Sequence, residues 1–392
     1  MKILLLHNYY QQKGGEDAVF EAEAELLRQQ GQTVETLIFQ NKDINGPLDS
    51  LKAGLNSFYN VGSAKRLKQV LQRFQPDVLH VHNTFPLASP AIFYTAQKAT
   101  VPIVMTLHNY RLLCANALLF ENNQPCERCV QAPIAWEGIL RGCYRGSRLQ
   151  SAALATMTTT HRLMGTWHHT IDAFITLTQF AQSRFTQSAL ALPPEKMHIK
   201  PNFIPDPGMI QSSDRQAHFL FVGRLSPEKG ISLLLDAAKS GVFQLKVIGA
   251  GPLAEDVQAA AQAHPNIEYL GFQDHSVILQ AMRQSRALVL PSLCYEGFPV
   301  TLLEALATGT PIICAKTGGL PEIIPHEQAG LLFESGSSED LLKQIHRLLA
   351  DNALHERLGQ QGREHYLNHF TPAHNYQALM RIYQHVMGVP HE

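Results

Sequence analysis

The sequence predicts an α/β protein built from two Rossmann-like domains. Short apolar runs of four to six residues alternate with longer amphipathic stretches along the whole chain. Such runs, when helices separate them, are typical of strands buried in parallel sheets. A proline-rich segment near residue 205 divides the runs into two series, so we expect one domain at 1–203 and a second at 204–372.

Each series contains five expected strands. In the first domain they lie at residues 3–6, 33–38, 77–82, 102–107 and 173–177, with an amphipathic helix at about 17–30 after the first strand. In the second domain they lie at residues 219–222, 245–248, 287–290, 311–314 and 330–333. The segment between the domains interrupts helices and central strands because it holds three prolines and a glycine. The tail at 373–392 is predicted to form a terminal helix that packs back on the first domain.

Composition excludes several classes of protein. The 392 residues are 45% hydrophobic and 17% charged, which is enough for two cores and too apolar for a disordered chain. The net charge of -1 gives no reason to expect a nucleic-acid partner. The first apolar run is far shorter than a signal peptide, and no apolar stretch approaches the ~18 residues of a membrane span. We therefore expect a cytoplasmic protein, whose six cysteines suit a reducing compartment.

Ligands of such sheets bind beyond the carboxyl ends of the strands, so the residues after each strand matter most for function. After the strand at 219–222, Arg224 and Lys229 flank a tight turn in the sequence G-R-L-S-P-E-K-G. An arginine fork and a lysine point charge suit a diphosphate. A solvated loop with a surface pair between Glu228 and Lys229 is the alternative.

A second motif reads Y-E-G-F-P-V-T-L-L-E-A, with Glu296 and Glu304 as its two acids. Pro299 suits a first helical turn, and the free amides of Val300 and Thr301 then form a positive helix end for phosphate. Glu296 before the helix and Glu304 inside it could hold hydroxyls at two ends of one ligand. Two ordinary surface acids would give the same spacing.

A third motif favours a different class of enzyme. Residues 249–254, G-A-G-P-L-A, follow a strand and open a helix, as in a dinucleotide-binding fingerprint, and Glu268 lies where such a site holds ribose hydroxyls. This supports an NAD-dependent oxidoreductase as the rival interpretation. That interpretation leaves the charged residues of the other two motifs without roles.

The order of these motifs resembles that in the family-4 retaining glycosyltransferases, and the resemblance covers nearly the whole chain. The motifs read, in order, G-R-L-S-P-E-K-G, V-I-G-A-G-P-L and P-S-L-C-Y-E-G-F-P-V-T-L-L-E-A-L-A-T-G-T-P-I. The resemblance implies the GT-B fold, in which two Rossmann-like domains face a cleft and the second holds most of the nucleotide sugar. It also implies that Arg224 and Lys229 bind the diphosphate, that Glu304 binds the ribose, and that Glu296 is a catalytic residue at the sugar hydroxyls. The other donor-site residues that it implies are Gly15, Gly249, Phe272, Phe298, Val300 and Thr301.

No catalytic metal is expected. The sequence lacks the D-x-D pair that joins metal to diphosphate in the other large class of glycosyltransferases. Arg224, Lys229 and a helix end could neutralise the leaving group instead.

In the first domain, Gly15 lies in a glycine turn between the first strand and the first helix. Close backbone approach there suits a donor phosphate, and a plain helix-capping turn is the alternative. His108, in T-L-H-N-Y-R, matches the family's histidine near the reacting sugar and is the second expected catalytic residue, although a strand-end histidine can also be structural. Weaker candidates for an acceptor site are His82, Asn83 and Arg111.

Four cysteines in the first domain have the spacing C-x11-C-x2-C-x13-C, and they are Cys114, Cys126, Cys129 and Cys143. Four thiolates could hold a structural zinc ion that ties a long loop together. Reduced or paired thiols are an equally good alternative. A catalytically silent binding module built around these cysteines is a third interpretation of the chain.

Residues 138–171 contain four arginines and three histidines but no aspartate or glutamate, and they include an apolar stretch. We interpret this segment as a contact with an anionic membrane or with a lipid-diphosphate acceptor, which would place the protein peripherally at the inner membrane face. A packed helix with a solvated basic face is the alternative.

Together these features predict a retaining glycosyltransferase of the hexosyltransferase type. It would move a sugar from a UDP-, GDP- or dTDP-type donor to a hydroxyl of a glycan or lipid-linked acceptor, in polysaccharide or lipid-linked glycan assembly. A sugar-nucleotide epimerase on the same fold is a nearer alternative than the oxidoreductase, and it would consume the donor without an acceptor.

Overall fold

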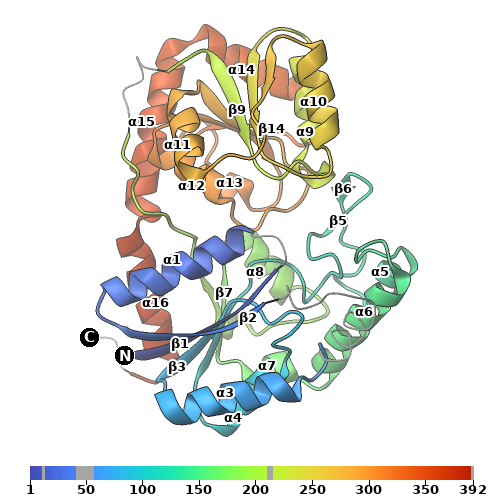
Figure 1. The fold of residues 1–392 in the computed structure, drawn as a ribbon, viewed down its shortest axis with the longest axis vertical. Helices are drawn as coiled ribbons and strands as arrows, with labels where there is room; N and C mark the ends of the chain where they lie inside the picture. Colours follow the sequence, from blue (N-terminus) through green and yellow to red (C-terminus); the bar gives the residue numbers. More distant parts are fainter. Residues whose placement is uncertain (11–13, 41–56, 210–214, 390–392) are drawn as a thin grey trace. The chain divides into compact units, whose positions relative to one another are not determined.

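The computed structural model describes residues 1–10, 14–40, 57–209 and 215–389, and it divides the chain into two compact units (Figure 1). Unit 1 comprises Met1–Leu119, Glu127–Asn202 and Asn375–Glu392. Unit 2 comprises Phe120–Cys126 and Phe203–His374. The main boundary therefore falls in the proline-rich segment, and a short segment from the first half of the chain groups with unit 2. The last residues of the expected tail, 390–392, lie outside the described residues.

Unit 1 is built on a six-stranded parallel sheet in the order β2-β1-β3-β4-β7-β8. Its strands are β1 (Lys2–Tyr9), β2 (Thr33–Gln40), β3 (Val78–Val81), β4 (Ile103–Thr106), β7 (Ala173–Thr176) and β8 (Met197–Ile199). Every residue of β3, β4 and β7 is buried, as expected of central strands that are covered on both faces.

Helices cover both faces of this sheet. They are α1 (Gly15–Gln29), α3 (Val61–Phe74), α4 (Ala91–Lys98), α5 (Trp136–Leu140), α6 (Arg148–Leu163), α7 (Thr166–Thr170), α8 (Gln179–Thr186) and the C-terminal α16 (Pro372–Val386). Figure 1 shows α1 and α16 on one side of the sheet and α3 and α4 on the other. Leu379 and Tyr383 of α16 share one apolar core with Ile3 of β1 and Phe20 of α1. The end of the chain therefore completes the core of the unit in which the chain begins.

Unit 2 repeats this architecture with a second six-stranded parallel sheet, in the order β11-β10-β9-β12-β13-β14. Its strands are β9 (His218–Val222), β10 (Gln244–Ile248), β11 (Ile267–Tyr269), β12 (Ala287–Leu290), β13 (Ile312–Lys316) and β14 (Leu331–Glu334). Its helices are α9 (Ile231–Ala238), α10 (Ala254–Ala263), α11 (His275–Gln284), α12 (Val300–Ala307), α13 (Leu320–Ile323), α14 (Ser338–Ala350) and α15 (Asn352–His369). Side-chain caps start the last two long helices, because Ser337 accepts from the amide of Asp340 and Asp351 from that of Leu354.

All ten strands expected from the sequence are present, and so are the first and last expected helices. The sequence did not predict β8 and β11, nor the small hairpin of β5 (Phe120–Glu121) and β6 (Gln124–Pro125). The strands β8 and β11 have three residues each and lie at sheet edges, so their apolar runs are too short to stand out.

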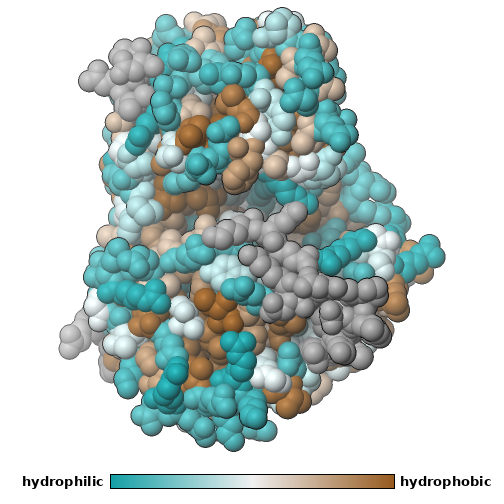
Figure 2. All heavy atoms as spheres, viewed as in Figure 1, coloured by the Kyte–Doolittle hydropathy of each residue, from teal (hydrophilic) through white to brown (hydrophobic). Residues whose placement is uncertain are grey.

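Hydrophilic residues cover most of α3 and α10 on the face drawn in Figure 2. None of the helices that the structure describes combines the length and the apolarity that crossing a bilayer requires.

Candidate active site

In unit 2, Lys229 and Glu296 form a close ion pair beyond the carboxyl ends of β9 and β12. Nζ of Lys229 lies 2.7 and 2.8 Å from the two carboxylate oxygens of Glu296, and Ser292 Oγ donates to Oε1 at 2.5 Å. Burial disfavours the charged form of Lys229, but the Glu296 carboxylate outweighs burial and raises the pKa of this lysine. An ammonium has three N–H groups, so two contacts with Glu296 leave one for an oxygen of a ligand.

Arg224 lies on the same loop and is held only loosely. Its Nη2 is 3.6 Å from Glu228 Oε1, and its side chain is 59% exposed. Ser226 Oγ donates to the same Glu228 oxygen at 2.6 Å. The alternative surface pair between Glu228 and Lys229 is therefore not what the loop forms: Glu228 pairs with Arg224, and Lys229 pairs with Glu296.

Glu304 is buried on the first turns of α12, and its partner is a histidine that sequence reasoning missed. His275 Nε2, at the start of α11, contacts Glu304 Oε1 at 2.7 Å. This hydrogen bond raises the pKa of His275, because the carboxylate stabilises the imidazolium. His275 is 69% exposed, so a ligand hydroxyl can replace it on Glu304 without opening the core. A single histidine at a helix start gives no signal in the sequence.

The N-terminus of α12 presents backbone amides beside these acids. Pro299 is the extended N-cap residue, and the first helical backbone bond runs from Leu302 N to Pro299 O at 3.1 Å. The amides of Val300 and Thr301 precede that bond, as the first amides of any helix do, and they form the positive end of the helix. The expected helix N-terminus is therefore present.

The glycine-rich turn after β10 packs against the loop after β9. A Cβ on Gly249 would lie 1.9 Å from Gly223 O, and one on Gly251 would lie 2.4 Å from Leu225 O. Both glycines have φ near +150°, and backbone hydrogen bonds join the two loops. This close backbone contact accounts for the glycines without a dinucleotide. Glu268, the ribose ligand of the rival interpretation, instead lies 3.5 Å from Lys246 at the surface.

The two aromatic residues expected in the donor site differ in exposure. Phe272 is 78% exposed and therefore open to stack on a planar ligand. Phe298 is buried, and its ring packs edge-on against Phe370 with centroids 5.7 Å apart. Phe298 thus supports the start of α12 from within unit 2.

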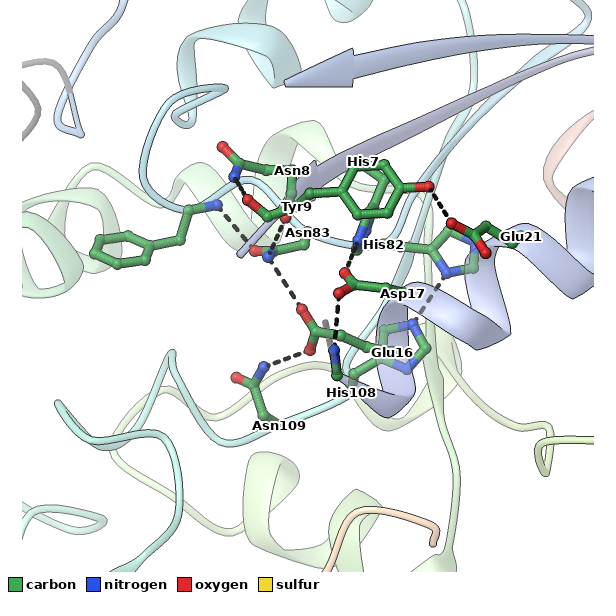
Figure 3. A network of polar contacts seen from close by, with 12 residues as sticks. His7, Asn8, Tyr9, Glu16, Asp17, Glu21, His82, Asn83, His108 and Asn109 are labelled. Atoms are coloured by element: carbon green, nitrogen blue, oxygen red, sulfur yellow. Dashed lines mark hydrogen bonds and ion pairs between the residues drawn. The ribbon is translucent and has the colours of Figure 1, made fainter. Parts of the chain in front are cut away.

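In unit 1, a buried polar cluster lies at the carboxyl ends of β1, β3 and β4 (Figure 3). His7 Nε2 contacts Asp17 Oδ1 at 2.7 Å, and Asp17 Oδ2 accepts from the amide of Gly14 at 2.9 Å. These contacts fix the turn in which Gly15, the exposed first residue of α1, is placed. The capping turn that was the alternative is therefore present, and it leaves the glycine backbone open to a ligand.

Glu16 joins two asparagines in this cluster, as Figure 3 shows. Asn83 Nδ2 donates to Oε1 and Asn109 Nδ2 to Oε2, each at 3.1 Å. Burial, followed by the charge of Asp17, raises the pKa of Glu16 to about 7. Sequence reasoning placed Asn83 here but gave Glu16 no role, because an acid in the first turn of a helix is common.

Arg111 packs its guanidinium over the rings of Phe85 and Tyr144, 4.9 and 5.4 Å from their centroids. Its Nη1 donates to Ala115 O at 2.7 Å. These contacts hold the loop after β4 and give Arg111 a structural role in unit 1.

His82 and His108 follow β3 and β4 and contact each other directly. His82 Nδ1 lies 3.0 Å from His108 Nε2, and the rings stack with centroids 5.2 Å apart. Burial, with the charge of His80 next, lowers the pKa of His82 to about 3. Burial and then His82 lower the pKa of His108 well below its usual range. Both imidazoles are therefore neutral near pH 7.

Behind these histidines, Glu23 and Lys200 form a fully buried ion pair that sequence reasoning missed. Lys200 Nζ lies 2.7 Å from Glu23 Oε2, and each side chain is 1% exposed. Burial alone would raise the pKa of Glu23, but Lys200 and the hydrogen bonds from His80 and His82 outweigh it and hold that pKa well below its usual range. The available signal was an acid on the apolar face of α1, between Phe20 and Leu27.

Three of the four spaced cysteines belong to unit 1, and their segments meet at Gly138 of α5. A Cβ on Gly138 would lie 3.6 Å from Cys129 Sγ and 3.8 Å from the Cβ of Ala115, the neighbour of Cys114. The amide of Cys143 donates to Gly138 O at 3.0 Å. Cys126 belongs to the segment that groups with unit 2.

Comparison with known proteins identifies both halves of the chain. The family model for glycosyl transferases group 1 matches residues 208–365, and that for the glycosyl transferase 4-like domain matches residues 14–202. An uncharacterized glycosyltransferase of Methanocaldococcus jannaschii, MJ1178, is 35% identical over 37% of this chain and 42% of its own. The phosphatidyl-myo-inositol mannosyltransferase of Mycobacterium leprae is 26% identical over 87% of this chain and 85% of its own. The chain thus spans under half the length of the first of these relatives and most of the second.

Solved structures share the fold at low sequence identity. Sucrose-phosphate synthase from Thermosynechococcus elongatus superposes with a TM-score of 0.73 at 16% identity, over 99% of each chain. Anabaena Alr3699/HepE, crystallised with UDP-glucose, has a TM-score of 0.66 at 18% identity over 97% of this chain and 99% of its own.

The chain has two Rossmann-like units, each built on a parallel sheet, and this architecture is the GT-B fold of the solved structures. Unit 2 also carries cationic groups and a helix N-terminus beyond the ends of its strands. Among proteins of this fold, the chain belongs to the glycosyltransferases of group 1, with a 4-like N-terminal domain. The family agrees with the resemblance seen in the sequence, and it excludes the oxidoreductase.

Proposed function

We propose that this chain transfers a sugar from a nucleoside-diphosphate sugar to an acceptor hydroxyl, with retention of the anomeric configuration. One observation carries the proposal. Unit 2 places the Lys229–Glu296 pair, the loosely held Arg224 and the start of α12 around the carboxyl end of its sheet, and Glu304 lies one turn further on. This set provides cations and amides for a diphosphate and a buried carboxylate for ribose hydroxyls.

In this proposal the charged groups act on the leaving diphosphate. Arg224 donates a fork of N–H groups, Lys229 donates its third N–H, and the first amides of α12 donate to a phosphate oxygen. These groups stabilise the negative charge that grows as the sugar–phosphate bond breaks, and no metal is needed for it. In this proposal the exposed ring of Phe272 stacks on the base.

We argue for retention of the anomeric configuration from the group that can take the proton of the acceptor hydroxyl. Glu296 accepts hydrogen bonds from Lys229 and Ser292, and Glu304 contacts His275, so both carboxylates are already occupied by partners within unit 2. The departing phosphate oxygen then takes the proton, and the acceptor attacks from the face that the phosphate leaves. The anomeric proton coupling of the product, read by NMR immediately after transfer, tests this: inversion would contradict it.

The central experiment is thermal unfolding and calorimetric titration with UDP, GDP, dTDP, ADP and NAD. We expect one sugar-nucleotide diphosphate to bind, and Glu304→Gln to weaken it about 10- to 100-fold because a charge-assisted hydrogen bond is lost. Glu268→Gln is the matched control, since it removes one acid from the same unit but only a surface contact with Lys246. Binding of NAD alone, lost in Glu268→Gln and kept in Glu304→Gln, would overturn the proposal.

We propose that unit 1 holds the acceptor, with His108 toward the reacting sugar, and that the acceptor is lipid-linked at an anionic membrane. Trp136 and Leu140 lie one turn apart on α5, and they and Leu149 at the start of α6 are all at least half exposed. Arg148 Nε donates to Leu140 O at 2.8 Å, which joins the apolar and basic residues into one surface. Exposed apolar groups beside arginines fit a bilayer interface.

Flotation with vesicles of 30% phosphatidylglycerol tests this surface. We expect Trp136→Ala with Leu140→Ala, and separately Arg145→Ala with Arg148→Ala, to reduce binding at least fivefold, about 1 kcal/mol per lost arginine contact. Val61→Ala, which removes an even more exposed apolar residue on α3, is the control. Equal binding of all variants would exclude this surface.

We also propose that the four spaced cysteines bind a structural zinc ion. Cys129 Sγ and Ala115, the neighbour of Cys114, both lie near Gly138, which supports this within unit 1. Four thiolates are the donor set of a closed, structural zinc site, which would tie the loop before α5. Zinc near one ion per chain, falling below ~0.2 in Cys129→Ser but not in the buried Cys294→Ser, is the expected result. Unchanged metal content in Cys129→Ser would contradict the site.

A further inference from the structure

A chain of buried contacts leads from the Glu23–Lys200 pair to the expected catalytic histidine. Glu23 Oε2 contacts Lys200 Nζ at 2.7 Å, and Glu23 Oε1 lies 3.3 Å from His82 Nε2. His82 Nδ1 in turn contacts His108 Nε2 at 3.0 Å, the contact drawn in Figure 3. Glu23, His82 and Lys200 are buried, whereas His108 is only half-buried. His108 is therefore the end of this row of contacts that a ligand can reach.

The Glu23–Lys200 pair sets the direction in which hydrogen bonds are donated along this row of contacts. Lys200 Nζ can only donate, which leaves the Glu23 carboxylate as an acceptor toward the histidines. Within the described part of the chain, His82 Nε2 and Glu23 Oε1 are buried atoms that complete no hydrogen bond, and they lie 3.3 Å apart. His80 Nδ1 lies 3.2 Å from the same carboxylate oxygen, but it already contacts the hydroxyl of Tyr383 at 2.7 Å. A hydrogen on His82 Nε2 satisfies both atoms. His82 Nδ1 then carries a lone pair, so the hydrogen between the two imidazoles belongs to His108 Nε2.

A divalent cation is the competing occupant of the space beside Glu23. The ligand atoms of Glu23, His80 and His82 lie within 4.8 Å of one another. However, the Lys200 ammonium already neutralises that carboxylate at 2.7 Å, so a divalent cation would leave its two positive charges uncompensated in a buried site. His80 Nδ1 also contacts the hydroxyl of Tyr383 at 2.7 Å. The charges therefore favour a proton over a metal ion.

We propose that Glu23, paired with Lys200, is a positioning residue that acts through His82 to fix the tautomer of His108. His108 then carries hydrogen on Nε2 and a lone pair on Nδ1, and it presents a hydrogen-bond acceptor to a ligand hydroxyl. The consequence for sugar transfer rests on the proposed function, whereas the tautomer itself does not. Lys200 also contacts Asn375 Oδ1 of α16 at 3.4 Å, so the C-terminal helix helps to hold the charged end in place.

The substitution Glu23→Gln should reverse the whole chain of hydrogen bonds. Lys200 accepts no hydrogen bond, so the introduced amide turns its oxygen toward Lys200 and its NH2 group toward His82. His82 Nε2 then becomes the acceptor, and its hydrogen moves to Nδ1. His108 Nε2 must accept in turn, and the hydrogen of His108 moves to Nδ1. The acceptor that His108 offered to the ligand becomes a donor.

Long-range 15N–1H correlation spectra of the full chain, with 15N-labelled histidine in a deuterated background, report these tautomers directly. Signals are assigned from His82→Gln and His108→Gln. We expect hydrogen on His108 Nε2 in the wild type and in Glu25→Gln, which removes an exposed acid two residues along α1. We expect hydrogen on Nδ1 in Glu23→Gln. Sugar transfer should fall at least tenfold in Glu23→Gln alone, while nucleotide binding by unit 2 stays unchanged.

Lys200→Met reaches the same state by another route if Glu23→Gln fails to fold. Without its counter-ion the buried Glu23 takes up a proton and donates to His82, so the same reversal is expected. Hydrogen on His108 Nδ1 in the wild type, an unchanged tautomer in both variants, or one bound metal ion per chain that is lost in His82→Gln would each overturn the proposal. If no donor supports transfer, the proposed function fails while the spectra still decide the tautomer.

Discussion

The contact between the two glycine turns of unit 2 gives the sharpest test of how the proposed donor site is built. Gly249→Ala places a methyl group where Gly223 O lies 1.9 Å away. The loops must separate by about 1.5 Å before that contact becomes an ordinary one. Such a shift breaks the bonds from Gly223 N to Ile248 O, 3.1 Å, and from Leu225 N to Ala250 O, 2.9 Å.

The cost can be estimated from these contacts. Each lost backbone hydrogen bond costs about 1 kcal/mol, and a non-glycine residue at a positive φ costs about 1–2 kcal/mol more. Gly249→Ala should therefore lower the free energy of unfolding by about 3–4 kcal/mol. Gly241→Ala is the matched control, because Gly241 has φ of +75° but no atom of the described residues within 4 Å of the added Cβ. Only the backbone term, about 1–2 kcal/mol, applies there.

Calorimetry of both variants without ligand measures the difference. For a unit of this size, about 2–4 °C per kcal/mol gives a fall in Tm of about 6–16 °C for Gly249→Ala and about 2–8 °C for Gly241→Ala. The loop also carries Arg224, so nucleotide binding should weaken in Gly249→Ala and not in Gly241→Ala. Equal Tm values for Gly249→Ala and the wild type, with only ligand binding lost, would refute the packing explanation and restore a ligand-binding role for the glycine.

Two further predictions concern pH. Glu304 raises the pKa of His275, so the stability from this pair is fully present below the ordinary histidine pKa and is lost as pH rises through the raised value. The Tm difference between wild type and His275→Gln should therefore be larger at pH 6 than at pH 9. A difference that grows with pH would contradict the pairing. The pKa of Glu16 is raised to about 7, so ionising this acid opposes folding as pH rises from about 4.5 to 7. Glu16→Gln should gain stability relative to the wild type over that interval in a pH series of denaturant titrations, and a constant difference would exclude the raised pKa.

The sheets could be predicted from the sequence because their central strands are buried on both faces. A short apolar run that helices flank, such as residues 219–222, predicts a parallel core strand, and β9 is indeed buried at every residue. The edge strand β11 pairs on one side only and mixes Glu268 between apolar residues, so its three residues give too little pattern. Burial on both faces produces the apolar run that identifies a central strand, and edge strands lack this run because they are less buried.

The residues of the proposed donor site could be selected from the sequence for a different reason. Lys229, Glu296 and Glu304 lie at fixed places relative to a strand end and a helix start, so local sequence positions them. Their partners were not predictable, because His275 reaches Glu304 from 29 residues away. The pairing of Glu23 with Lys200 spans 177 residues, and no local pattern in either segment indicates the other. Contacts that depend on two distant segments meeting require the fold to be known.

The two units treat their charges in opposite ways, and this difference suits their proposed tasks. In unit 2 the cation of Arg224 and the histidine on Glu304 are mostly exposed, so incoming phosphate and ribose groups can replace their present partners at little cost in desolvation. Binding there should weaken as salt rises. In unit 1 the pair of Glu23 and Lys200 is sealed in the core, where exchanging either partner would leave an unpaired buried charge. An exposed set of charges can capture and release a donor at every turnover, whereas a sealed one can only hold His108 in a fixed state.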